Sequence, residues 1–170
     1  GFRLGPRINA AGRLGCARLV VELLTTYSPI KAREAAEFLE DQNSKRQTIE
    51  RNLTAAAKQM VDDLGYADAP AIVLGQVEWH PGVVGIGAAR LKETYNRPAV
   101  VIGLDGGQGK GSGRSVTGVD RGSAIAAVQR QGLLLRGGGH RMAAGLTLAR
   151  DMLEPAMQRL GELIARQSGQ

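Results

Sequence analysis

The chain has 170 residues, with 22 Lys and Arg against 16 Asp and Glu, for a formal net charge of +6. Its length and its 43% hydrophobic content are typical of a globular domain with an attached segment, which excludes a wholly disordered chain. A single cysteine, Cys16, excludes a disulfide framework and a thiolate zinc site, and no apolar run approaches the roughly 20 residues that span a bilayer. We therefore expect a cytoplasmic protein with no membrane partner. Because the chain starts at Gly1 and not at Met, we also expect it to be a piece of a longer protein.

The first 65 residues predict helices. A short helix is expected from Ala10 or Gly15 to Leu24, and a long one over 29–64, a stretch without glycine or internal proline. Ser28-Pro29 is a typical N-terminal cap, and Gly65 is a typical stop. Residues 40–47 are entirely polar, which favours a helix that connects two bodies.

Beyond Gly65 the pattern alternates between strands and helices. Expected strands cover 71–74, 99–102 and 143–148, with 110–116 as an edge strand, and expected helices cover 81–95 and 121–131. A last helix with the apolar stripe Leu153, Met157, Leu160 and Ile164 follows a pair that resembles a capping box, Asp151 and Glu154. The predicted fold is α/β: a mixed β-sheet with flanking helices, preceded by a long connector helix.

The positive charge is confined to two segments that are also rich in glycine. Residues 1–18 hold four arginines and no acid, and residues 108–150 hold seven bases against Asp120 alone. Arginine beside glycine favours a surface where the backbone closely approaches a polyanion, although such loops can also simply be solvated.

Two motifs in these segments carry candidate anion-binding side chains. In residues 5–15, Arg7 and Arg13 have forked guanidinium groups suited to phosphate, and Asn9 offers a donor and an acceptor; the alternative is a capped loop with solvated arginines. In residues 106–115, alternate glycines would expose backbone N–H groups to an anion, beside three polar side chains. The alternative to an anion-binding segment is a flexible hairpin. The three polar side chains are Lys110, Ser112 and Arg114.

Two further motifs contain the only histidines. Gly137, Gly138 and Gly139 precede His140, and we expect them to bring it and main-chain donors to a surface. His80 lies at an expected helix start, where it either helps to hold an anion or satisfies the first turn.

The sequence lacks the residues that metal binding and base stacking would need. Two histidines and one cysteine, with no acidic cluster near the glycine-rich segments, indicate no metal site in this chain. Six aromatic residues argue against base stacking as the main mode of binding. The predicted contacts are therefore with phosphates and sugars, which carry little sequence information.

These blocks, in their order, resemble the RecJ-type single-stranded-DNA exonucleases of the DHH phosphoesterase superfamily. The resemblance rests on residues 5–15, 79–86, 109–115 and the block Gly-Gly-Gly-His with Ala-Ala-Gly at 137–145. It implies a 5′→3′ exonuclease of DNA repair and recombination that depends on Mn²⁺ or Mg²⁺. The metal ligands would belong to a DHH domain outside this chain, so the chain alone is expected to bind no metal and to be inactive.

The same resemblance implies three parts and two partners. Residues 1–27 would be the tail of the DHH domain, 28–65 the connector helix and 66–170 the DHH-associated substrate-binding domain. The partners would be single-stranded DNA and the DHH domain of the same polypeptide, with the candidate side chains facing one cleft. Because other families share the last block, an oligoribonuclease or cyclic-dinucleotide phosphodiesterase and a non-catalytic RNA-binding module remain alternatives.

Overall fold

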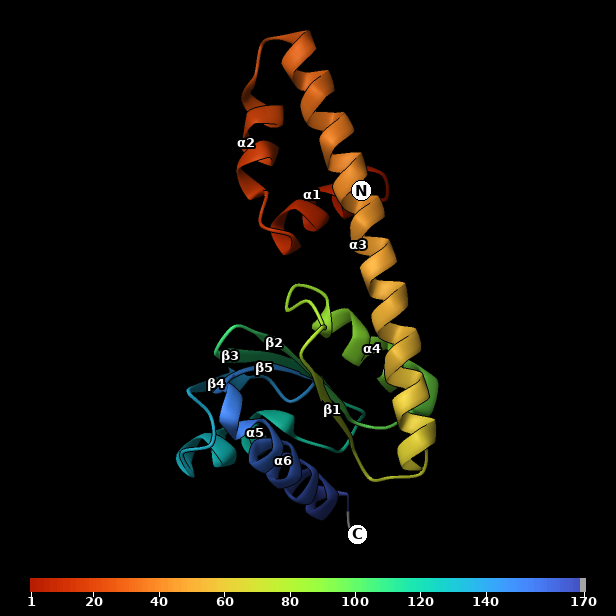
Figure 1. The fold of residues 1–170 in the computed structure, drawn as a ribbon, viewed down its shortest axis with the longest axis vertical. Coiled ribbons are helices and arrows are strands. Elements are labelled where there is room, and N and C mark those ends of the chain that lie inside the picture. The colour runs from red at the N-terminus through yellow and green to blue at the C-terminus, as the bar shows by residue number, and fades with distance from the viewer. Residues whose placement is uncertain (169–170) are drawn as a thin grey trace. The chain divides into compact units, whose positions relative to one another are not determined.

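The computed structural model describes residues 1–168, which form two compact units. One unit consists of residues 1–51, and the other begins at Asn52. The long helix α3 (Pro29–Leu64) contributes to both (Figure 1). No helix among residues 1–168 is long and apolar enough to cross a membrane.

The first unit contains α1 (Leu4–Arg13), α2 (Ala17–Thr25) and the first part of α3. The expected helix with its start at Gly15 corresponds to α2, whereas a start at Ala10 is wrong and α1 was not predicted as a separate helix. Gly15 has φ +86°, a left-handed conformation that ends α1 and that other residues rarely adopt. Pro6 lies in the first turn of α1, where its missing N–H removes no helical hydrogen bond.

The helix α3 has the predicted bounds because both of its ends are encoded locally. The Ser28 hydroxyl accepts a hydrogen bond from the Lys31 N–H at 3.3 Å, and Gly65 follows the last turn with φ +68°. The polar stretch 40–47 is not uniformly solvated, because Gln42 and Asn43 are buried.

The second unit is a five-stranded mixed sheet in the order β1-β2-β3-β5-β4. Only β1 and β2 run parallel among its pairs. Its elements are β1 (Ile72–Gln76), α4 (Val84–Tyr95), β2 (Ala99–Asp105), β3 (Gln108–Arg114), α5 (Arg121–Arg130), β4 (Arg136–Gly139), β5 (Ala143–Ala149), a 3₁₀ turn (Arg150–Met152) and α6 (Leu153–Gln167). The predicted α/β fold is confirmed.

Helices cover the two faces of the sheet unequally (Figure 1). The main core lies between the sheet and α5 and α6, where Ile102, Leu148, Ile125 and Leu160 are fully buried. On the opposite face α4 packs against β2 and β3. The last helix shows the predicted apolar stripe, but the predicted capping box is absent, because the N-cap is Met152 and no side chain caps the helix.

The strand β3 lies in the middle of the sheet, not at the predicted edge. Glycines at every second position make room for neighbouring side chains: a Cβ atom on Gly111 would lie 2.8 Å from Ile102 Cγ1 and 2.9 Å from Leu146 Cδ1. The two-residue turn at Gly106 and Gly107 joins β2 to β3, and Gly106 has φ +61°. The backbone N–H groups of β3 therefore lie between two paired strands and are not displayed as a loop.

Candidate functional site

The alternation of residues along β3 separates a core face from a polar face. Gly109, Gly111 and Gly113 point toward the core, so Lys110, Ser112 and Arg114 point to the face on which α4 packs. The first turn of α4 reaches these side chains: a Cβ atom on Gly85 would lie 3.2 Å from both Ser112 Oγ and Arg114 Nη2.

The strand register places two rows of residues beside each other on this polar face. Ser112 is opposite Gly145, which is opposite Gly138, and the next row contains Lys110, Thr147 and Arg136. We call this surface the open face; it comprises Lys110, Ser112, Arg114, Arg136, Gly138 and Gly145. A shallow hollow of about 370 Å³ lies on it and is lined by all of these residues except Ser112 and Arg114.

The three consecutive glycines before His140 have different roles. A Cβ atom on Gly137 would lie 2.5 Å from Ile125 Cγ2, and Gly139 has φ +144° and touches the backbone of β5. A Cβ atom on Gly138 would meet nothing within 4 Å, and one on Gly145 would meet only the Gly111 carbonyl oxygen, at 3.9 Å. Packing thus explains Gly137 and Gly139 but neither glycine of the open face.

The open face is electrostatically positive. The residues that β3, β4 and β5 direct to this side include three bases and no acid. Arg114 Nη1 donates to Ser112 Oγ at 2.8 Å and to the Gly113 carbonyl oxygen at 2.9 Å, which fixes its guanidinium beside the glycines. Such an array of fixed donors over bare backbone suits phosphate oxygens. Gly145 was outside the predicted site, because the register that brings it and Arg136 to this face is not visible in the sequence.

His140 lies at the tip of the hairpin between β4 and β5, at the same end of the sheet as Arg114. It lines a second hollow, of about 510 Å³, with Asp120 and Ser123 at the start of α5 and with Arg141 and Met142. The Asp120 carboxylate accepts a hydrogen bond from the Ser123 N–H at 3.2 Å and so caps α5. Arg114 does not line this hollow.

The other predicted histidine, His80, takes part in a local turn. Its Nδ1 accepts a hydrogen bond from the Gly82 N–H at 2.9 Å, two residues before α4 begins at Val84. His80 therefore closes a turn that precedes α4 and does not cap the helix, because the N-cap is Val83 and no side chain caps it; anion binding by His80 stays a prediction.

The remaining predicted residues belong to the first unit, where they lie on a helix and not on a loop. Arg7 Nε donates to Glu40 and its Nη1 to the Arg3 carbonyl oxygen. At about 100° per residue, Arg13 lies about 40° from Asn9 around α1 but about 120° from Arg7. The structure therefore separates Arg7 from Asn9 and Arg13, and a cleft shared with the open face stays a prediction.

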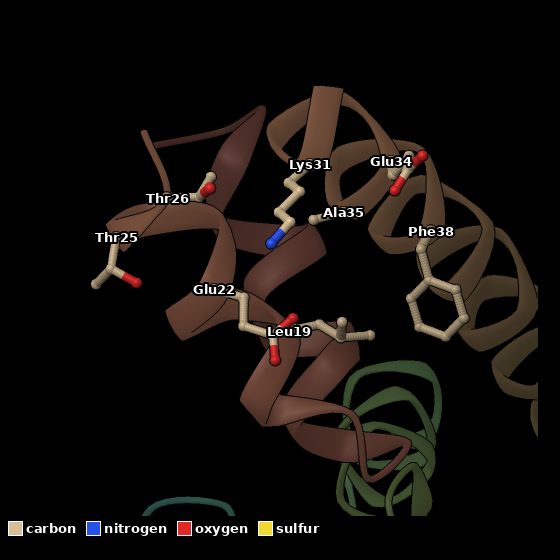
Figure 2. A pocket seen from close by; sticks show the side chains of 8 residues that line it. All are labelled: Leu19, Glu22, Thr25, Thr26, Lys31, Glu34, Ala35 and Phe38. Atoms are coloured by element: carbon tan, nitrogen blue, oxygen red, sulfur yellow. The ribbon is translucent and has the colours of Figure 1, made fainter. Parts of the chain in front are cut away.

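A further hollow, of about 680 Å³, lies within the first unit (Figure 2). Figure 2 shows Leu19 and Glu22 from α2 and Lys31, Glu34 and Phe38 from α3 around it. Two carboxylates against one ammonium group make this hollow a poor site for phosphate. None of the candidate site residues predicted from the sequence lines it.

Comparison with known proteins places the second unit in a family. The family model described as the DHHA1 domain matches residues 68–166. The chain belongs to the DHHA1 domain family. The matched segment contains β1 to β5 and all of the open face, so the face lies within the DHHA1 domain of this chain.

The similarity extends beyond the DHHA1 domain to nearly the whole chain. The chain is 38% identical to the single-stranded-DNA-specific exonuclease RecJ of Bacillus subtilis and 39% identical to that of Escherichia coli, in each case over 96% of its length. It covers 21% and 30% of these relatives, so it spans less than a third of either. A crystal structure of RecJ from Thermus thermophilus with Mg²⁺ superposes with a TM-score of 0.82 at 36% identity, covering 97% of this chain and 25% of that one. A structure of exonuclease RecJ bound to manganese gives a TM-score of 0.83, also at 36% identity, covering 97% of this chain and 40% of that one.

Proposed function

We propose that this chain is the substrate-binding part of a metal-dependent 5′→3′ exonuclease for single-stranded DNA, and that its open face holds the phosphate backbone of the strand. The similarity to RecJ exonucleases over 96% of the chain supports the activity of the longer protein. The charge and shape of the open face support the part played by this chain. Within it we propose residues 1–27 as the tail of the catalytic domain, 28–65 as the connector and 66–170 as the binding domain.

The observation that carries this proposal is the pair Gly138 and Gly145. Glycine inside a strand weakens the sheet, because it restricts the unfolded chain least and packs no side chain. These two glycines adjoin in register and have open space above them, so the fold itself does not require them. Bare backbone between Arg136 and Ser112 lets a chain of phosphates and sugars approach the sheet closely.

The chain does not hold the catalytic metal in this proposal. Among residues 1–168, no three His, Cys, Asp or Glu side chains are grouped so that they could hold a metal ion. The residues present therefore do not fit Mn²⁺ or Mg²⁺, and we assign the ligands to a DHH domain of the same polypeptide. Without that domain the chain should not hydrolyse DNA.

A salt titration of strand binding tests the proposal. In the full-length protein, with divalent metal removed, Arg114→Ala should weaken the binding of single-stranded DNA and lower the slope of log K against log salt by about 0.7, the value for one phosphate contact. The matched control is Arg130→Ala, which removes an exposed arginine from the last turn of α5 and should change neither quantity. An unchanged slope for Arg114→Ala would refute the assigned contact.

The choice of substrate distinguishes the proposed activity from the alternatives. Degradation of long single strands supports the exonuclease, whereas activity confined to substrates of two to five nucleotides would indicate an oligonucleotide or cyclic-dinucleotide phosphodiesterase. Preferential binding of folded RNA without cleavage would indicate an RNA-binding module.

A further inference from the structure

Arg121, the first residue of α5, is a wholly buried arginine whose charge has no acidic partner. Its exposed fraction is 0%, and its side chain passes beneath Gly113, where a Cβ atom would lie 2.5 Å from Arg121 Cδ. Nη1 donates to the carbonyl oxygen of Ala99 at 3.2 Å, and Nε and Nη2 are buried without a hydrogen-bond partner. Arg121 forms no ion pair with any residue from 1 to 168.

Three physical effects make this arrangement unfavourable for folding. A buried cation loses its hydration, its two unpartnered nitrogens lose their hydrogen bonds to water, and its position at the N-terminus of α5 opposes the helix dipole. Burial, together with the nearby charge of Arg114, lowers the pKa of Arg121 to about 10, so the group remains protonated at neutral pH. Folding alone would favour an apolar residue at this position.

The location of the guanidinium suggests what offsets this penalty. Gly113 separates Ser112 from Arg114 in β3, and its missing side chain lets Arg121 lie against the strand from below. Ala99, which accepts its hydrogen bond, is the register partner of Arg114. The cation thus lies under the part of the open face where Ser112 and Arg114 present their donors, separated from it by the thickness of one strand.

We propose that Arg121 is a positioning residue that acts through the sheet, adding positive potential from below to an anion held by Ser112 and Arg114. This inference rests on the proposed function. A charge enclosed by protein is screened by mobile ions much less than an exposed one, so its attraction persists at salt concentrations that weaken surface contacts. Arg121 itself touches no phosphate and displaces no counterion.

A buried charge should therefore change the affinity for the strand without changing its salt dependence, whereas a surface contact should change both. We compare Arg121→Leu, Arg121→Lys and Arg114→Ala in the full-length protein, using a single-stranded oligonucleotide in chelator across a range of salt concentrations, with Tm measured in parallel. Arg121→Leu should raise Tm, because it removes an unpaired buried charge. It should also weaken binding on the order of tenfold, the effect of a unit charge about 10 Å away at an effective dielectric constant of about 20. The salt slope should not change.

Arg121→Lys should keep most of the affinity, because it retains the charge, whereas a role in packing alone would not distinguish lysine from leucine in this way. A raised Tm with unchanged affinity for Arg121→Leu would overturn the inference, since the buried charge would then do nothing for binding. A lowered Tm would also overturn it, by showing that the charge is compensated within the fold. If Arg114→Ala leaves affinity and salt slope intact, the proposed function fails first, and this outcome is distinct from failure of Arg121→Leu alone.

Discussion

Substitutions at Gly138 and Gly139 should have opposite consequences although the two residues are adjacent. Alanine at position 139 would adopt φ +144° and place its Cβ 2.5 Å from Ala144 Cα and 2.6 Å from the Ala143 carbonyl oxygen. The backbone conformation costs about 1–3 kcal/mol, and the overlap with a paired strand costs about 1–3 kcal/mol more. We therefore expect Gly139→Ala to lower the free energy of unfolding by about 2–6 kcal/mol. Gly138→Ala should change it by less than about 1 kcal/mol, because its methyl group enters open space.

Urea unfolding followed by tryptophan fluorescence measures both effects. The single tryptophan, Trp79, is 5% exposed and belongs to the same unit as the two glycines, so its emission reports the relevant transition. A loss below about 1 kcal/mol for Gly139→Ala would refute the steric argument. Gly138→Ala should instead weaken strand binding at unchanged stability, and full affinity in that variant would contradict the close approach proposed for the open face.

Three further substitutions test other parts of the structure. Leu53→Ala should cost about 2–4 kcal/mol in thermal unfolding, because Leu53 is 3% exposed and fills the space above Gly87 of α4; a cost below about 1 kcal/mol would contradict this packing. Asp120→Ala should cost about 1 kcal/mol by loss of the α5 cap, with Asp120→Asn, which retains the acceptor, as the milder control. Arg7→Met should cost less than about 1 kcal/mol, as an exposed ion pair does, and a larger loss would show that this arginine has a structural role beyond the pair.

The long helix was predictable because its signals are local. Ser28, Pro29 and Gly65 fix its ends without reference to any other part of the chain. The break between α1 and α2 depends on the conformation of Gly15, and a glycine in an otherwise helical pattern does not by itself show whether the helix continues.

The order of the strands was not predictable in the same way. The glycines of β3 suggested an edge or a loop, because glycine is unfavourable inside a strand when only local preferences are considered. The side chains of Ile102 and Leu146 fill the space over Gly111 and turn this apparent weakness into the centre of the sheet. That information resides in β2 and β5, far from Gly111 in sequence. For the same reason no strand was predicted over residues 136–139, where the structure has β4.

The types of residue at the candidate site were predictable, whereas their grouping was not. Lys110, Ser112 and Arg114 alternate with glycine, so the sequence alone indicates that they share one side of any strand. The addition of Arg136 requires the pairing of β4 with β5. Arg121 was counted only as one of the bases in a charged segment, because nothing in its neighbourhood along the chain predicts that it is buried.

The space around Gly137, Gly138 and Gly139 differs, so other proteins with this sheet should not conserve the three glycines equally. Positions 137 and 139 should stay glycine wherever the hairpin is preserved, whatever the protein does, since Ile125 and the β5 backbone exclude anything larger. Packing places no such constraint on position 138, where a side chain would enter open space. A homologue that no longer binds a polymer substrate should therefore lose glycine first at position 138 and at its register partner, position 145, which distinguishes homologues that keep the binding face from those that keep only the fold.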